Sequence, residues 1–115
     1  FAEPRAPAWN RIVEASGSNA CDSPLGEVLI LRNFNVDHAR FFVNYTITMD
    51  AGVVDFELAD PFSSVKHSRR FSASGSDTVD VQDPLPGIWE WRVNCPAAVR
   101  VNLEWNLVVE ALSRG

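Results

Sequence analysis

Four basic side chains lie close together in an otherwise acidic chain, at Lys66, His67, Arg69 and Arg70. They could bind a sulfated, phosphorylated or carboxylated partner, because each donates hydrogen bonds to anionic oxygens. The serine-rich surroundings predict an exposed loop or a short strand at the edge of a sheet. On an edge strand the same charges would protect the sheet against pairing with another sheet. The cluster is thus a candidate binding site with a structural alternative.

Three aspartates, Asp77, Asp80 and Asp83, follow at intervals of three residues. Ca²⁺ takes about six to eight oxygen ligands, so these carboxylates are candidate calcium ligands. Their spacing does not match an EF-hand loop, and on an extended segment successive members point to opposite sides. The sequence therefore predicts no bound cofactor, with calcium as the alternative.

The two histidines, His38 and His67, are the candidates for acid–base catalysis. Each has a polar neighbour, Asp37 or Ser68, but a Ser-His-Asp constellation needs three groups brought together, and no G-x-S-x-G motif is present. Zinc would need more ligands than two histidines and two cysteines supply once the cysteines are bonded. The sequence predicts a protein that is not an enzyme, with a small hydrolase as the remaining alternative.

Two tryptophans, Trp89 and Trp91, share one face of a predicted strand and could stack against a sugar ring. Val93 and Cys95 continue that face, which is typical of a buried core. Trp105 lies between two leucines on its own face. We therefore expect all three indoles in the core, with a sugar-binding platform as the alternative for the first two.

The clearest structural element is the segment from residue 99 to 110, where apolar and polar residues alternate. One face carries Val99, Val101, Leu103, Trp105, Leu107 and Val109, and the other carries Arg100, Asn102, Glu104, Asn106 and Glu110. A strand with one apolar and one polar face belongs to an antiparallel sheet packed on a single core.

Further strands are predicted at residues 27–32, 40–49, 53–58, 68–73, 77–82 and 88–95. The strand at 27–32 is apolar on both sides, so we expect it to be central and covered on both faces. Residues 1–26 are predicted to form an extended arm with one short strand near 9–15, and residues 27–115 a single domain. Seven to eight strands without a convincing helix predict an all-β, jelly-roll-like antiparallel β-sandwich. Its expected core is Phe41, Val43, Tyr45, Ile47, Val54, Phe56, Leu58, Val79, Val81, Trp89, Trp91, Val93, Val101, Leu103, Trp105 and Leu107.

The two cysteines, Cys21 and Cys95, are too far apart in sequence for a CxxC motif. We expect a disulfide between them, which would close a loop of about 75 residues and stabilise the fold by roughly 4 kcal/mol. The alternative is two buried thiols in a cytosolic protein. The chain begins at Phe1, as a mature protein does after loss of a signal peptide, although an internal fragment would look the same. These features together favour a secreted, periplasmic or cell-surface protein.

The formal charge of −5 opposes binding to nucleic acid, and no apolar run approaches the roughly 20 residues that cross a bilayer. We therefore expect neither a nucleic-acid partner nor membrane insertion, and look for a protein or glycan partner. Asn44-Tyr45-Thr46 has the form of an N-glycosylation sequon.

Two segments carry a family resemblance. Residues 54–61 read VDFELADP, and after a serine-rich stretch residues 85–93 read LPGIWEWRV. Over residues 43–109 the chain resembles the bacterial pre-peptidase C-terminal domains and the related jelly-roll P-domains, in which a strand ending in L-x-D-P precedes a polar loop and a Pro-Gly-aromatic turn. Phe62 replaces the glycine that usually follows Asp-Pro, so the turn there must differ. The resemblance implies an exported, non-catalytic accessory domain that sometimes binds calcium.

Three functions follow as hypotheses. The first is an exported accessory or binding module that recognises a protein or glycan through its loops or an edge strand. The second is a structural subunit whose exposed strands oligomerise or extend a partner's sheet. The third is the small hydrolase.

Overall fold

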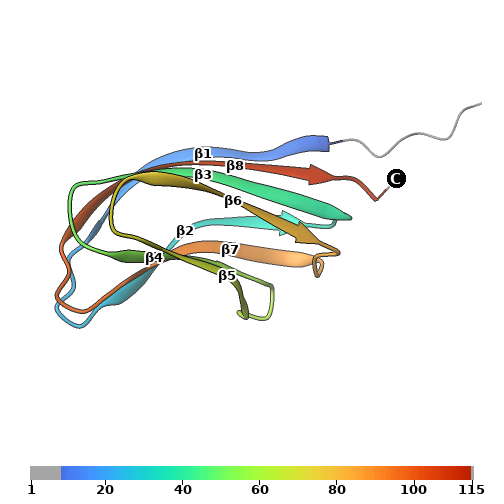
Figure 1. Ribbon diagram of the computed structural model, residues 1–115. Helices are drawn as coiled ribbons and strands as arrows, with labels where there is room; N and C mark the ends of the chain where they lie inside the picture. Colours follow the sequence, from blue (N-terminus) through green and yellow to red (C-terminus); the bar gives the residue numbers. More distant parts are fainter. Residues whose placement is uncertain (1–8, 115) are drawn as a thin grey trace, which may run out of the picture.

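The computed structural model of the chain describes residues 9–114, which form two four-stranded antiparallel sheets packed face to face (Figure 1). The first sheet has the order β1-β8-β3-β6 and the second the order β2-β7-β4-β5. The strands are β1 (Trp9–Cys21), β2 (Glu27–Val36), β3 (Arg40–Met49), β4 (Val54–Ala59), β5 (Val65–Phe71), β6 (Gly75–Gln82), β7 (Gly87–Cys95) and β8 (Val101–Leu112). This arrangement confirms the predicted jelly-roll sandwich. The described residues include no helix long and apolar enough to cross a membrane.

The core lies between the sheets and follows the predicted alternation. Every residue expected in the core is buried except Val81, which is partly buried against it. Trp91 is at the centre, with its ring centroid 5.2 Å from those of Tyr45 and Phe56 and 5.1 Å from that of Trp105. The buried residues outside the expected set are Val13, Cys21, Phe34, Val36, Ala59, Asp60, Phe71, Cys95, Val109 and Ala111.

The N-terminal segment belongs to the sandwich, which corrects the boundary predicted at residue 26. β1 has 13 residues and pairs with β8 from Trp9 to Cys21; residues 1–8 of the expected arm lie outside the described part. Gly17 permits this pairing, because a Cβ there would lie 2.7 Å from the indole of Trp105. That indole donates a hydrogen bond from Nε1 to Asn19 Oδ1 at 2.9 Å. Serine and glycine are common in loops, but here backbone pairing with β8 holds these residues of β1 in a strand.

The strand expected to be central is instead at an edge. Among the described strands, β7 is the only one paired with β2, and the β2 side chains Val28 and Ile30 are 51 % and 55 % exposed. The strand also continues to Val36 rather than ending near residue 32, and it buries Phe34 and Val36. Apolar residues on both sides of β2 therefore do not reflect burial on both sides within this chain.

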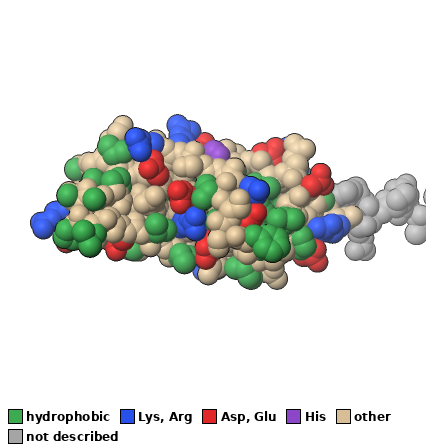
Figure 2. Space-filling view, turned by 90° about the horizontal axis from the view of Figure 1, so that it is seen from below, with side chains coloured by type: hydrophobic (Ala, Val, Ile, Leu, Met, Phe, Trp, Pro, Cys, Tyr) green, Lys and Arg blue, Asp and Glu red, His purple; other side chains and the backbone are tan. Residues whose placement is uncertain are grey.

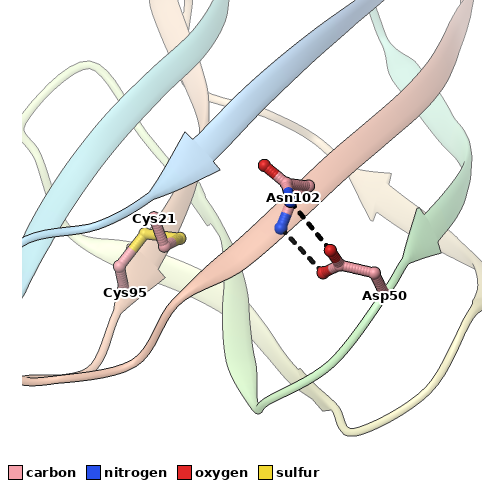
Figure 3. The surroundings of a disulfide bond; sticks show 4 residues. All are labelled: Cys21, Asp50, Cys95 and Asn102. Carbon is pink, nitrogen blue, oxygen red and sulfur yellow. Dashed lines mark hydrogen bonds between the residues drawn. A yellow bond between two sulfur atoms is a disulfide. The ribbon is translucent and has the colours of Figure 1, made fainter.

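A disulfide between Cys21 and Cys95 joins the ends of β1 and β7, so it links the two sheets (Figure 3). It confirms the predicted bond and leaves no free cysteine among the described residues. Beside it, Asp50 in the turn after β3 accepts hydrogen bonds from the backbone N–H of Asn102 at 2.9 Å and from its Nδ2 at 2.8 Å. This end of the sandwich is thus held by a disulfide and by a turn whose Asp50 carboxylate accepts two hydrogen bonds from Asn102.

Candidate functional site

The sandwich has two open sides, each formed by one edge strand from each sheet. β1 and β2 lie on one of them, which we call the β1/β2 side, and the two strands are in contact. β5 and β6 lie on the other, the β5/β6 side, where side chains of the two strands interact directly. Unpaired strand edges are the places where a β-sandwich can add a strand from another chain. The two sides differ in how well they are protected.

On the β5/β6 side, four polar side chains form what we call the Asp77 cluster: Tyr45, His67, Arg69 and Asp77. Asp77 Oδ2 accepts a hydrogen bond from the Tyr45 hydroxyl at 3.2 Å and lies 2.9 Å from His67 Nε2. Its Oδ1 accepts a hydrogen bond from Arg69 Nη1 at 2.9 Å. The cluster therefore joins β5 of one sheet to β3 and β6 of the other.

The electrostatics of this cluster keep Asp77 ionised and Tyr45 protonated. Burial alone raises the pKa of Asp77, but the hydrogen bonds from His67 and the backbone of Thr78, with the charge of Arg69, lower it by more, so the pKa lies below its ordinary value. Burial and the adjacent Asp77 charge both raise the pKa of the Tyr45 hydroxyl. A phenol held protonated in this way is a poor nucleophile.

We expect the Asp77 cluster to make stability depend on pH in the acid range. The pKa of Asp77 is lower in the folded protein than its ordinary value of 3.8. The ionised carboxylate therefore stabilises the fold above that value, and this contribution is lost as the pH falls through the folded pKa. Asp77→Asn should be less stable than wild type at neutral pH, and the difference should shrink below pH 3.8, as measured by urea unfolding across the acid range. A difference that does not change with pH would contradict this assignment.

Each basic residue predicted as a binding cluster faces a carboxylate. His67 and Arg69 contact Asp77, Arg70 Nε lies 3.0 Å from Asp55 Oδ1, and Lys66 Nζ lies 3.7 Å from Asp60 Oδ2. β5 is an edge strand, which confirms the predicted placement of these residues at the edge of a sheet. The charges are thus largely compensated within the chain, and recognition of an anion by this cluster stays a prediction.

The turn that precedes β5 is organised by Asp60, which is 3 % exposed. Its Oδ1 accepts hydrogen bonds from the backbone N–H groups of Phe62 and Ser64, both at 2.9 Å. Ser63 has a φ of 63°, so the left-handed residue of this turn lies one position after Phe62. This geometry explains how the turn forms without the glycine that the resemblance leads one to expect after Asp-Pro.

The three aspartates considered for calcium are not brought together. Asp77 points into the cluster, whereas Asp80 is bound by Arg40, whose Nε donates to Asp80 Oδ1 at 2.8 Å. Asp83 lies in the turn after β6, with a φ of 49°. Within residues 9–114, no three His, Cys, Asp or Glu side chains are close enough to hold a metal ion.

The two histidines occupy different elements and neither meets a serine nucleophile in the described part of the chain. His38 lies between β2 and β3, and its Nδ1 accepts a hydrogen bond from the backbone N–H of Asp37 at 3.1 Å. His67 pairs with Asp77, and the hydroxyl bound to that carboxylate is the phenol of Tyr45. The His67–Asp77 pair is therefore part of the inter-sheet cluster.

The tryptophans considered as a sugar platform are in the core. Trp89 is 2 % exposed and Trp91 is 1 % exposed, which confirms the expected core placement and rules out the platform alternative for both. Trp89 Nε1 donates to the carbonyl of Leu85 at 2.8 Å, while Trp91 Nε1 is the one buried side-chain polar atom of the described residues that has no partner.

Asn44, in the sequon, lies on the outer face of the first sheet and accepts a hydrogen bond from Thr78 Oγ1 at 2.7 Å.

The β1/β2 side carries the less protected edge. On β2, Val28 and Ile30 are more than half exposed, and the flanking Glu27 and Arg32 form no ion pair with any other described residue. On β1, by contrast, the exposed side chains near the middle are polar. Figure 2 views the face of the second sheet, where exposed hydrophobic side chains form separate groups among charged ones. Sequence reasoning predicted this strand but missed its edge position, because apolar residues on both sides are also typical of a buried central strand.

Comparison with known proteins places the chain by fold. No family model and no curated protein matches its sequence. A solved structure of a protein from Bacillus endospore appendages, described as a novel family of disulfide-linked pili, has 8 % sequence identity, covers 98 % of this chain and 96 % of that chain, and has a TM-score of 0.59. A protein of infectious bursal disease virus strain Gt has 12 % identity over 92 % of this chain and 33 % of its own, with a TM-score of 0.46. The pilus protein thus shares the β-sandwich fold of this chain along nearly its whole length.

Proposed function

We propose that this protein is an exported, non-catalytic structural module that assembles with protein chains by pairing through its edge strand β2. The observation that carries this proposal is the exposure of Val28 and Ile30 on a strand with one neighbour. A long apolar edge is the feature that monomeric β-proteins normally avoid, because it pairs readily with other strands. Here it is retained, while the opposite side of the sandwich is closed by the Asp77 cluster.

The similarity to an endospore appendage protein supports an assembly role, since that protein belongs to pili. Those pili are described as disulfide-linked. In the present chain the two cysteines are already bonded to each other, within one molecule. Association through β2 would therefore be non-covalent unless the Cys21–Cys95 bond were exchanged.

Two further observations support an exported role without catalysis. A disulfide that links the two sheets is typical of proteins in oxidising compartments, which include the exterior of the cell and the periplasm. The one histidine–carboxylate pair of the described residues is completed by Arg69 and a protonated phenol rather than by a nucleophile. Burial of Trp89 and Trp91 also removes the aromatic surface that favoured a glycan partner, which leaves a protein partner.

The proposal predicts concentration-dependent self-association that requires the apolar edge. Sedimentation velocity of the wild-type chain should show a mass above that of the monomer at high concentration. A variant that combines Val28→Lys with Ile30→Lys should remain monomeric, because pairing of β2 with another strand would bury the two new ammonium groups at the interface. Both side chains are more than half exposed, so the fold should tolerate the changes.

Ile88→Lys is the matched control, because Ile88 is 51 % exposed and lies on β7, which is not an edge. This variant should associate as wild type does. A wild-type chain that stays monomeric at every accessible concentration would contradict the proposed function, as would equal effects of the β2 and β7 substitutions.

A further inference from the structure

We propose that the strand paired with β2 is β2 of a second copy, antiparallel and related by a two-fold axis perpendicular to the second sheet. This inference rests on the proposed function and names its partner. Four observations carry it: the charges at the two ends of the exposed segment, the facing of its apolar side chains, the composition of the competing edge, and the anchoring of β2 by the disulfide.

The exposed segment of β2 is self-complementary in charge. It begins at Glu27, ends at Arg32 and is apolar between them. An antiparallel copy places the acidic end of one strand near the basic end of the other, at both ends of the pair. A parallel copy would instead align like charges, which destabilises a sheet. The absence of intramolecular ion pairs at Glu27 and Arg32 leaves both groups available for this contact.

The directions in which the side chains of β2 point are also compatible with a two-fold axis. Rotation about an axis perpendicular to the sheet keeps the outer face of both copies on the same side. Pairing centred on Leu29 then sets Val28 of each copy opposite Ile30 of the other, and it sets Glu27 opposite Leu31, one residue from Arg32. Cross-strand pairs of β-branched residues on one face stabilise a sheet. The two copies would form one continuous sheet of eight strands, twice the four strands of each copy.

The other edge of the same sheet is a poorer partner. β5 carries the cations Lys66, Arg69 and Arg70 and no acidic residue, so it would bring like charge to Arg32. Two of its side chains, His67 and Arg69, are committed to Asp77 on the neighbouring sheet. An edge with charged side chains turned toward the core is one of the ways in which proteins block pairing.

The disulfide prepares β2 for association. Glu27 is paired with Cys95, so the first residue of the exposed segment lies beside the covalent link between the sheets. Gly26, just before it, has a φ of 80°, and a Cβ there would lie 2.8 Å from the Cys95 carbonyl oxygen. The edge is thereby ordered before it meets a partner, which lowers the entropy lost on binding.

A charge-exchange experiment tests the two-fold arrangement. Glu27→Lys and Arg32→Glu, each alone, should raise the dimer dissociation constant about tenfold, because the symmetry repeats each mismatch at both ends of the interface. The double variant, with both substitutions, should recover an affinity close to that of wild type. Sedimentation equilibrium gives the constants, and circular dichroism verifies that each variant is folded.

Other outcomes separate this inference from the proposed function. Tighter association of Arg32→Glu, or loss of association in Val65→Lys on β5, would indicate head-to-tail pairing of β2 with β5. Either result would overturn the two-fold arrangement and leave assembly through β2 intact. Failure of the double variant to recover, or growth of the wild type beyond a dimer through β2, would also overturn the two-fold arrangement alone. A wild type that is monomeric throughout would overturn both.

Discussion

Removing the Cys21–Cys95 disulfide should lower the free energy of unfolding by roughly 4 kcal/mol. The bond joins residues 74 positions apart in sequence and connects the two sheets. Without it, the conformational entropy of the unfolded chain rises, because no crosslink closes the large loop, while the folded sandwich keeps its packing. Urea unfolding of a variant that combines Cys21→Ser with Cys95→Ser, compared with the oxidised wild type, measures this difference.

Wild-type protein unfolded in the presence of a reducing agent is the control for this experiment. It should match the double serine variant in stability, and both should show a steeper dependence of the unfolding free energy on urea, because an uncrosslinked unfolded chain exposes more surface. A serine variant with the urea midpoint of the oxidised wild type would show that the bond contributes nothing to stability.

Replacing Trp91 by alanine should lower the free energy of unfolding by about 3–5 kcal/mol. The side chain is 1 % exposed, and its ring packs on Tyr45, Phe56 and Trp105 at centroid distances of 5.1–5.2 Å. Truncation leaves a cavity among rigid aromatic neighbours from both sheets, which cannot close it by small movements. Urea unfolding followed by circular dichroism measures the loss.

Phenylalanine at the same position separates packing from polarity. Trp91→Phe keeps an aromatic ring and removes an indole N–H that has no partner among the described residues, whose burial costs about 1–3 kcal/mol. Trp89→Phe is the matched control, because the Trp89 N–H is bonded to the carbonyl of Leu85 and its removal leaves that oxygen unpaired. We expect Trp91→Phe to cost less stability than Trp89→Phe. The reverse order would mean that the Trp91 N–H is satisfied in solution.

Local alternation was sufficient to predict most of the core. Residues 99–110 alternate so regularly that the apolar set became the inner face of β8, and Trp89 and Trp91 followed the same rule on β7. The disulfide was also predictable as a pair, because the chain has only two cysteines. In each case the information is contained in the order of residues along one strand or in the count of one residue type.

The position of a strand within its sheet was not predictable in this way. The apolar residues on both sides of β2 indicated a covered central strand, yet among the described strands β2 pairs with β7 alone. β1 shows the opposite case, since residues 1–26 were expected to form an arm with only a short strand near 9–15, but Ser16, Gly17 and Ser18 are also paired with β8. The number of neighbours that a strand has depends on hydrogen bonds between distant segments, and side-chain periodicity does not record them.

The candidate site shows the same division. The basic residues at 66–70 could be identified from sequence, but their carboxylate partners Asp55, Asp60 and Asp77 come from other strands and turns, and these partners largely compensate the basic charge. By itself the sequence determined which faces are apolar, which cysteines are available and that the fold is an antiparallel sandwich, since these depend on local periodicity and composition. Only the tertiary structure decided which charges neutralise one another and which apolar strand remains uncovered, because both depend on which distant segments become neighbours.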